Sequence, residues 1–325
     1  LGELRDGFDK FSAHDINVYA ISYDDQETLR EFAENQDIPF PLLSDIDSTV
    51  IRQFGILNQQ VSKNDGMLYG IPYPGAYVTD ENGVVVAKFF HDSYKKRDSA
   101  ELYIDAALGR MALDESAPQV QGGDREVKLT VAVHGGKGTI RQGIIRHLLV
   151  RFELPDGLHI YGPPVPDGLV ATEIQIDAPT GFQLMAPQFP KTQKLVLANI
   201  AELNVWNGTV DLVYPFYATG ELASECRPLD VPSIDIEVTV RYQACTDVEC
   251  LLPRKEVLSL SLDLDVIDIP SLRIHRGHGQ REGNYDSMPA LRRLIARKAK
   301  KYPLGIPAFI VRNIWLRVVA LFRKH

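Results

Sequence analysis

Stretches in which apolar and polar residues alternate dominate residues 126–268 of this 325-residue chain. The clearest run extends from Ile234 to Tyr242, where an apolar residue takes every second position. A period of two places the apolar side chains on one face, so each such run predicts a half-buried strand. Turn residues separate about seven runs, at residues 127–134, 146–154, 171–176, 195–203, 209–218, 234–242 and 257–266. We therefore expect an all-β sandwich.

The pattern is different in residues 1–113, where stretches with helical periodicity alternate along the chain with stretches of strand periodicity. Leu4, Phe8 and Phe11 are spaced as on one face of a helix, and Asp24 or Asp25 can cap a second helix. The expected elements are a helix over residues 2–11, a strand at 16–22, helices at 25–35, 48–54 and 99–108, and a hairpin formed by 77–78 and 84–90. This order predicts an α/β domain whose sheet has mixed strand directions.

Two further segments complete the predicted organisation. Residues 114–125 are polar, contain Gly and Pro and show no periodicity, so we expect a linker. Residues 269–325 form a basic, partly helical tail. Within it, the apolar run 306–322 is interrupted by Arg312 and Arg317 and is too short and too charged to span a bilayer. Its basic residues and Trp315 suit an amphipathic helix on an anionic membrane surface, the alternative being a helix docked on protein.

Composition narrows the class of protein. Hydrophobic residues make up 45% of the chain and charged residues 24%, which is typical of a globular protein. The formal net charge of −8 argues against general nucleic-acid binding, and we expect no nucleic-acid partner. The last forty or so residues are nevertheless strongly basic, so the remainder is correspondingly acidic.

The residues with the clearest candidate chemistry are two cysteines, Cys245 and Cys250. They follow the end of the 234–242 strand and have four residues between them. Two thiols in a tight loop can store two electrons as a disulfide, or attack another protein's disulfide. A structural disulfide and half of a zinc site are the alternatives, and zinc is disfavoured because a second Cys/His pair at ligand spacing is missing. We expect no cofactor beyond a redox-active disulfide. The third cysteine, Cys226, is expected to be a free thiol in a loop.

The second half of the chain contains Tyr242-Gln-Ala-Cys245, Cys250, Leu251-Leu-Pro253 and the alternating residues 257–264. This series resembles the N-terminal domain of the thiol:disulfide interchange protein DsbD. It implies an immunoglobulin-like sandwich over residues 126–268 in which Cys245 and Cys250 are the redox couple. Which cysteine attacks and which resolves stays open, as does whether His159, beside Tyr161, lies against them.

The first 110 residues contain an ordered series of motifs: Val18-Tyr-Ala-Ile-Ser22, Phe40-Pro-Leu-Leu-Ser-Asp45, Phe54-Gly-Ile56, Tyr69-Gly-Ile-Pro72 and Pro74-Gly-Ala-Tyr-Val-Thr-Asp-Glu-Asn-Gly83. This series resembles the peroxiredoxin-like AhpC/TSA family, which has a thioredoxin-like fold. The resemblance implies a cis-proline beside the active-site cysteine, for which Pro74 is the candidate and Pro72 the weaker one. The family's catalytic cysteine and first strand have no counterpart here, so we expect Leu1 to lie just downstream of them.

Three hypotheses about function follow. The leading one is a thiol-disulfide oxidoreductase that passes electrons through Cys245 and Cys250 to or from a thioredoxin-like partner, or the chain's own N-terminal domain. A second is a peroxiredoxin-like peroxidase whose catalytic cysteine lies upstream of Leu1. A third is a non-catalytic docking module with a structural disulfide. The relatives implied by the two resemblances occupy different compartments, so the sequence leaves the location of the protein open.

Overall fold

The chain folds into two compact units. The computed structural model describes residues 1–62, 69–93, 95–114, 116–196, 202–246, 248–266, 288–305, 307–308, 310–312 and 314–315. The first unit comprises Leu1–Gln119 with Ala132–Gly138 and Ile144–Leu149, and the second comprises Val120–Val131, Thr139–Gly143 and the chain from Val150 onward. Two strands, β7 (Lys128–His134) and β8 (Ile144–Glu153), therefore contribute residues to both units.

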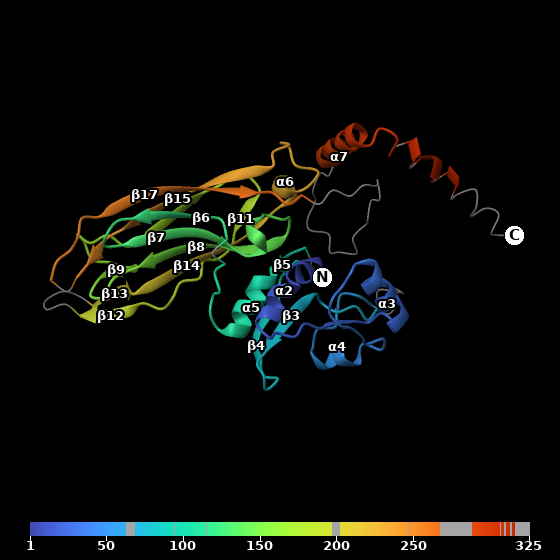
Figure 1. Ribbon diagram of the computed structural model, residues 1–325, viewed down its shortest axis with the longest axis horizontal. Coiled ribbons are helices and arrows are strands. Elements are labelled where there is room, and N and C mark those ends of the chain that lie inside the picture. Colours follow the sequence, from blue (N-terminus) through green and yellow to red (C-terminus); the bar gives the residue numbers. More distant parts are fainter. Residues whose placement is uncertain are drawn as a thin grey trace. The chain divides into compact units, whose positions relative to one another are not determined.

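The first unit is a thioredoxin-like α/β arrangement, as the sequence predicted (Figure 1). Strand β1 pairs in parallel with β2, and β3 pairs antiparallel with β4. Both strand directions occur, but in two separate two-stranded sheets and not in the single mixed sheet that was predicted. Its elements are α1 (Gly2–Asp6), α2 (Phe8–Ala13), β1 (Ala20–Ser22), α3 (Gln26–Asn35), β2 (Leu42–Ser44), α4 (Thr49–Gln53), β3 (Gly75–Thr79), β4 (Val85–Phe90), β5 (Arg97–Asp98) and α5 (Ala100–Leu108).

Local side-chain chemistry explains where these elements begin and end. The Asp25 carboxylate accepts a hydrogen bond of 2.8 Å from the Thr28 amide and so caps α3, which confirms the predicted cap. Asp80 closes the hairpin between β3 and β4 by accepting hydrogen bonds from the amides of Asn82 and Val84. Helix α5 ends at Gly109, whose φ of 65° lies in the left-handed region that glycine enters at little cost.

Helices α2 and α5 share the small apolar core of the first unit. Phe11, Ala100 and Ile104 are buried there, and Leu4 packs against them from α1. Two of the residues whose helical spacing suggested an N-terminal helix, Leu4 and Phe11, therefore do contact the core. The chain turns between them at Gly7, so the single predicted helix is two short ones.

The second unit is rich in strands, and its longest sheet has the order β11-β14-β8-β7-β6 (Figure 1). Two smaller sheets have the orders β10-β15-β17 and β12-β13-β9-β16. Its remaining strands are β6 (Gln119–Gly123), β9 (His159–Tyr161), β10 (Glu173–Asp177), β11 (Phe182–Leu184), β12 (Gln193–Val196), β13 (Glu202–Asn207), β14 (Thr209–Ala218), β15 (Ser233–Tyr242), β16 (Ala244–Cys245) and β17 (Arg254–Asp263). Short helix α6 (Gly220–Ala223) follows β14, and α7 (Met288–Lys301) belongs to the basic tail.

Period-two burial holds along the strand that leads to the cysteines. In β15, Ile234, Ile236, Val238, Val240 and Tyr242 are buried, while the residues between them are partly or fully exposed. Strand β15 pairs antiparallel with β17 along its whole length, from Ser233 opposite Asp263 to Tyr242 opposite Arg254. This pairing fixes the point at which the chain leaves the sheet and enters the cysteine-containing loop.

The segment expected to be a linker contains a strand. Residues 119–123 form β6, which lies beside β7 at the end of the longest sheet. Gly122 and Gly123, read in the sequence as flexible, are required here for close packing. A Cβ on Gly122 would lie 2.6 Å from the Glu256 carboxylate, which accepts the Gly123 amide hydrogen at 2.8 Å. Gly123 also has a φ of 90°, which a residue with a side chain rarely adopts.

Two other expectations differ from the structure or lie outside it. The run 195–203, predicted as one strand, contributes to two strands, β12 and β13, which pair antiparallel; residues 197–201 are outside the described part of the chain. The apolar run 306–322 is partly outside it as well, because residues 306, 309, 313 and 316–322 are not described. Among the described residues, no helix combines the length and the apolar character that crossing a membrane requires.

Candidate functional site

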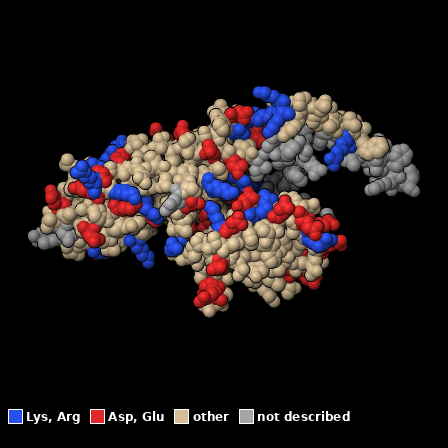
Figure 2. All heavy atoms as spheres, viewed as in Figure 1, with Lys and Arg blue, Asp and Glu red and all other residues tan. Residues whose placement is uncertain are grey.

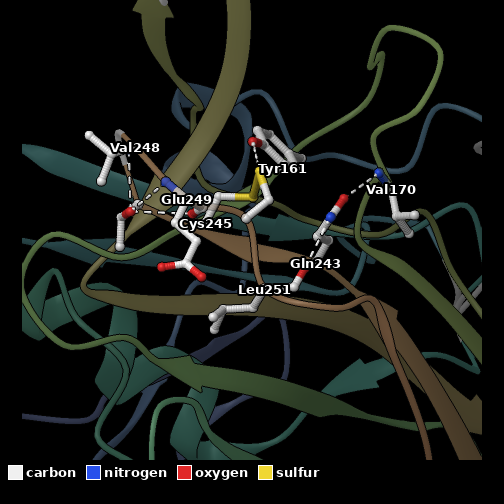
Figure 3. The surroundings of a disulfide bond; sticks show 9 residues. Tyr161, Val170, Gln243, Cys245, Val248, Glu249 and Leu251 are labelled. Atoms are coloured by element: carbon white, nitrogen blue, oxygen red, sulfur yellow. Dashed lines mark hydrogen bonds between the residues drawn. A yellow bond between two sulfur atoms is a disulfide. The ribbon is translucent and has the colours of Figure 1, made fainter.

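A disulfide joins Cys245 to Cys250 in the second unit (Figure 3). Cys245 is the last residue of the two-residue strand β16, which pairs antiparallel with β9. The chain then turns back, so that Cys250 lies opposite Cys245 in an isolated antiparallel bridge. The sequence prediction that the two cysteines sit where a strand leaves the sheet is confirmed.

Backbone hydrogen bonds and one threonine shape the loop between the cysteines. The Thr246 amide donates to the Glu249 carbonyl at 2.7 Å, and the Leu251 amide donates to the Ala244 carbonyl at 2.9 Å. The Thr246 hydroxyl oxygen also accepts the Glu249 amide hydrogen at 3.0 Å. These bonds join the two arms of the loop in addition to the disulfide.

The two cysteines differ sharply in exposure. Cys245 is fully buried, with 0% of its surface exposed, whereas Cys250 is exposed. The residues around Cys250 are exposed as well, at 95% for Val248 and 87% for Leu252. An attacking thiolate needs a direct approach to the sulfur it attacks. Another protein can therefore approach Cys250 but not Cys245.

Strand β9 supplies the aromatic neighbours of the disulfide. His159 is directly opposite Cys245 in the β9–β16 register, so the two side chains project from the same face of the sheet. Tyr161, two residues further along β9, projects from that face too. Its hydroxyl oxygen lies 3.6 Å from the Cys250 sulfur (Figure 3). The question that the sequence left open about His159 is settled, because β9 brings it beside the cysteines.

This tyrosine is a neutral hydrogen-bond donor. A phenol with the ordinary pKa of 10 is already protonated at physiological pH, and desolvation raises the pKa of Tyr161 further. Its ring meets that of His159 edge to face, with 5.4 Å between ring centroids. A neutral donor beside Cys250 favours the thiolate over the thiol, because a hydrogen bond to the charged form stabilises that form.

The disulfide packs against an apolar cluster through the buried Cys245. Tyr161, Leu203, Val205 and Cys245 form its buried part. Val165 and Leu169, from the loop between β9 and β10, and Leu195 from β12 pack against it. The buried cysteine is thus part of a packed core.

Gln243 fastens that loop to the cysteine segment, a role that sequence reasoning missed. Its side-chain oxygen accepts the Val170 amide hydrogen at 3.0 Å, and its nitrogen donates to the Leu251 carbonyl at 3.1 Å (Figure 3). Gln243 is buried, although glutamine is usually exposed. The sequence marked Gln243 only as a member of the Tyr-Gln-Ala-Cys motif. That motif does not predict which groups the Gln243 side chain hydrogen-bonds.

The remaining candidate residues lie elsewhere. Pro74 precedes β3 in the first unit. Among the described residues the one cis peptide bond is that between Pro163 and Pro164, so the bond before Pro74 is trans and the cis expectation is wrong. Trans is the ordinary isomer, favoured by about 0.5–1 kcal/mol. Cys226 is a free, half-buried thiol between α6 and β15, as predicted. Within the described part of the chain, His, Cys, Asp and Glu form no cluster suited to a metal ion.

The fold and the site define a class of protein: a thioredoxin-like unit joined to a β-rich unit that carries an accessible disulfide. Comparison with protein families identifies both parts. Residues 1–88 match the AhpC/TSA family, and residues 139–262 match the family described as "Thiol:disulfide interchange protein DsbD, N-terminal". The chain therefore carries an AhpC/TSA segment at its N-terminus and a DsbD N-terminal domain after it, and both resemblances stated from the sequence are confirmed.

Curated relatives of the first part are peroxiredoxins. The chain is 32% identical over 106 residues to the chloroplastic peroxiredoxin Q of Sedum lineare, covering 32% of this chain and 50% of that protein. It is 30% identical over 102 residues to the putative peroxiredoxin bcp of Haemophilus influenzae, covering 31% of this chain and 63% of that protein. The chain thus spans about half to two thirds of the length of these relatives.

A solved structure similar to the second part is the reduced N-terminal domain of DsbD from Neisseria meningitidis. The sequence identity is 17%, the TM-score is 0.25, and the match covers 45% of this chain and 85% of that one.

Proposed function

We propose that this protein performs thiol-disulfide exchange through Cys245 and Cys250. The observation that carries the proposal is the pairing of an exposed sulfur, Cys250, with a fully buried one, Cys245, inside a domain that matches the DsbD N-terminal family. A disulfide with one accessible sulfur can be opened from outside, and its buried half is held ready to close it again. A disulfide that only stabilises the fold has no need of an accessible sulfur.

The exchange begins at Cys250. In the reduced protein, the Cys250 thiolate attacks one sulfur of the partner's disulfide, and the partner's other sulfur leaves as a thiolate that takes up a proton. Cys245, after losing its proton, then attacks the Cys250 sulfur and releases the partner's second thiol. The partner gains two electrons and two protons, and this protein is left with the Cys245–Cys250 disulfide. In the opposite direction, a partner thiolate attacks Cys250 and displaces Cys245.

The partner is proposed to be a thioredoxin-like redox protein, and the β-rich unit to be an immunoglobulin-like sandwich that presents the disulfide to it. Support comes from the family match, whose name describes thiol:disulfide interchange. Residues 1–225 contain no cysteine. The partner's cysteines therefore belong to another protein or to a segment outside these residues, and the first unit by itself supplies none.

A thiol peroxidase activity is the second candidate, favoured by the AhpC/TSA match and the peroxiredoxin relatives. Within residues 1–325 the thiols are those of Cys226, Cys245 and Cys250, all after residue 225. A peroxidatic cysteine of the AhpC/TSA type would therefore belong to a segment outside this chain. The 1–325 chain is expected to consume hydrogen peroxide no faster than a variant that lacks all three cysteines, at equal dithiothreitol.

Single-thiol variants test the main proposal. On a Cys226→Ala background, Cys245→Ala leaves only the exposed thiol, and Cys250→Ala leaves only the buried one. Each variant is mixed with a thioredoxin that keeps a single active-site cysteine, activated as a mixed disulfide with thionitrobenzoate. Thionitrobenzoate is then the leaving thiol, and no second thioredoxin thiol can release the adduct. Mixed disulfides are resolved by non-reducing electrophoresis and mass spectrometry. The account expects a stable adduct through Cys250 and little or none through Cys245. Adducts through Cys245 alone, or through neither cysteine, would contradict it.

A further inference from the structure

The C-terminal part of the chain carries charge of a single sign. Residues 288–325 contain ten lysines and arginines and no aspartate or glutamate. The ten are Arg292, Arg293, Arg297, Lys298, Lys300, Lys301, Arg312, Arg317, Arg323 and Lys324. Thiol-disulfide exchange at Cys245 and Cys250 makes no use of them. Lysine and arginine atoms are visible over α7 in the space-filling view (Figure 2).

Three of these basic residues anchor α7 to the loop after α6. The Lys298 ammonium lies 2.6 Å from the Glu225 carboxylate, and Lys298 is only 5% exposed. The Arg297 guanidinium donates to the Glu225 carbonyl at 2.8 Å, and that of Arg293 donates to the Cys226 carbonyl at 2.7 Å. Helix α7 is therefore docked on the second unit, whereas the two sequence-based alternatives concerned the run 306–322 that follows it. Arg292, Lys300 and Lys301 remain exposed on it.

Beyond α7, the described residues present apolar side chains to solvent. The backbone is helical at residues 310–312 and 314–315. Ile310 and Ile314 are four residues apart, as are Val311 and Trp315, so the four side chains share one side of the helix. All four are exposed, and Trp315 has 65% of its surface accessible. Arg312, which follows Val311 in the sequence, is exposed too.

We propose that this basic–apolar segment, the described residues from Lys300 to Trp315, binds the surface of an anionic lipid bilayer. Ile310, Val311, Ile314 and Trp315 enter the boundary between headgroups and acyl chains, and the exposed cations on either side contact lipid phosphates. Buried apolar area and attraction to anionic lipid together drive the binding of such segments, and tryptophan favours the headgroup level.

Charge and composition favour lipid over other occupants. An apolar groove on a second copy or another protein would account for the exposed side chains, but it would not require ten cations without an acid. A bilayer with anionic headgroups satisfies both features, because each basic residue near its surface adds to the attraction. Helix α7 then links the membrane-binding segment to the second unit, through its contacts with Glu225 and Cys226.

The fluorescence of one tryptophan can report binding of this segment to vesicles. It has two tryptophans, of which Trp206 is 5% exposed and Trp315 is 65% exposed. A blue shift on adding vesicles therefore reports Trp315. The full 1–325 chain is titrated with vesicles of phosphatidylcholine alone and of phosphatidylcholine mixed with phosphatidylglycerol, at low and high salt, with cosedimentation measured in parallel. Binding and a blue shift are expected with the mixed vesicles at low salt, and both should weaken at high salt.

Paired variants separate the contributions. Lys300→Gln with Lys301→Gln should weaken binding to mixed vesicles roughly tenfold or more, since each basic residue contributes about 1 kcal/mol. Lys128→Gln with Lys255→Gln, which removes the same charge elsewhere in the second unit, should change it much less. Ile314→Ser with Trp315→Phe should weaken binding and abolish the blue shift, while the near-ultraviolet circular dichroism of the fold remains.

The outcomes that overturn the proposal are distinct from failure of the redox function, which these measurements do not involve. Absence of binding to mixed vesicles overturns it, as does equal weakening by both lysine pairs. A blue shift that follows protein concentration without vesicles overturns it in favour of a second copy of the chain on the same apolar side chains.

Discussion

The hydroxyl oxygen of Tyr161 lies 3.6 Å from the Cys250 sulfur, across 89 residues of sequence. The tyrosine comes from β9 and the cysteine from the loop after β16, and the antiparallel pairing of these strands brings them together. The phenol beside the exposed cysteine is a neutral donor at physiological pH, and burial raises the pKa of Tyr161 further. This relationship links the fold of the second unit to the reactivity of its accessible sulfur.

Replacement of Tyr161 by phenylalanine tests that link. Tyr161→Phe keeps the buried ring but removes the hydroxyl, so a Cys250 thiolate loses a hydrogen bond. A hydrogen bond to a charged group contributes about 1.5–3 kcal/mol, so the pKa of the Cys250 thiol should rise by about one to two units. The rate of alkylation of reduced Cys250 by iodoacetamide, followed by mass spectrometry across pH, measures it. Superimposable profiles for the two proteins would show that the hydroxyl does not act on the sulfur.

Gln243 is expected to hold the site together. Gln243→Ala leaves the Val170 amide and the Leu251 carbonyl without their side-chain partner, which should lower the free energy of unfolding of the second unit by about 1–3 kcal/mol. Gln193→Ala, which removes exposed hydrogen bonds to Asn207, is the matched control and should cost no more than about 0.5 kcal/mol. Denaturant unfolding of both variants provides the comparison. Equal costs would rule out a special role for Gln243.

His147 should make the first unit sensitive to acid. Burial, together with the nearby charge of His134, lowers the pKa of His147 to about 4, although Asp105 and Asp98 act in the opposite direction. Its ordinary value is 6.5, so the unfolded chain takes up the proton first as pH falls, and stability is lost between about pH 6.5 and 4. The loss amounts to at most about 3 kcal/mol.

The variant His147→Gln should lose this part of the pH dependence. Thermal unfolding midpoints measured for both proteins at closely spaced pH values test it. The prediction fails if the midpoints of both proteins fall in parallel over the window.

Glu101 should extend the acid sensitivity to lower pH. Burial alone raises the pKa of Glu101, but hydrogen bonds from the Lys10 ammonium at 2.9 Å and the Gly136 amide at 2.8 Å outweigh it and bring the pKa to about 2. Because this value lies below the ordinary 4.5, the carboxylate stabilises the fold above pH 4.5, and that stability is lost as pH falls towards 2. The contribution is at most about 3 kcal/mol.

Glu101→Gln should lower the unfolding midpoint at pH 7 and flatten its decline below pH 4.5. Glu34→Gln is the control, because it removes an exposed carboxylate whose ion pair with Arg30 is worth little. If the two variants behave alike at pH 7, the contacts of Glu101 are not stabilising.

The sequence predicted those parts of the fold whose pattern is long and local. Strand β14 has the predicted bounds, and β15 differs by one residue. Regular alternation over the ten residues of β15 leaves little ambiguity. Strand β9 was missed: it has three residues, and Gly157 and Gly162 flank it closely. Strand β6 was missed because its glycines, which usually mark loops, permit close packing against Glu256 here.

The residues of the candidate site likewise include some that the sequence predicted and some that it did not. Cys245 and Cys250 were found because they are close in sequence and belong to a recognisable motif. The contacts of Cys250 with Tyr161 and of Gln243 with Val170 depend on pairing between distant segments, which a local pattern does not contain. The expectation of a cis bond at Pro74 came from family resemblance alone, and the structure has a trans bond there.

The redox potential of the Cys245–Cys250 pair tests the central claim most directly. The full chain with Cys226→Ala is equilibrated in graded glutathione or dithiothreitol buffers, and its thiols are then alkylated and counted by mass spectrometry. A pair that exchanges electrons with a thioredoxin-like partner should have a midpoint within about −120 to −270 mV, the range of known exchange proteins. A midpoint below about −300 mV would identify a structural disulfide and contradict the proposed function.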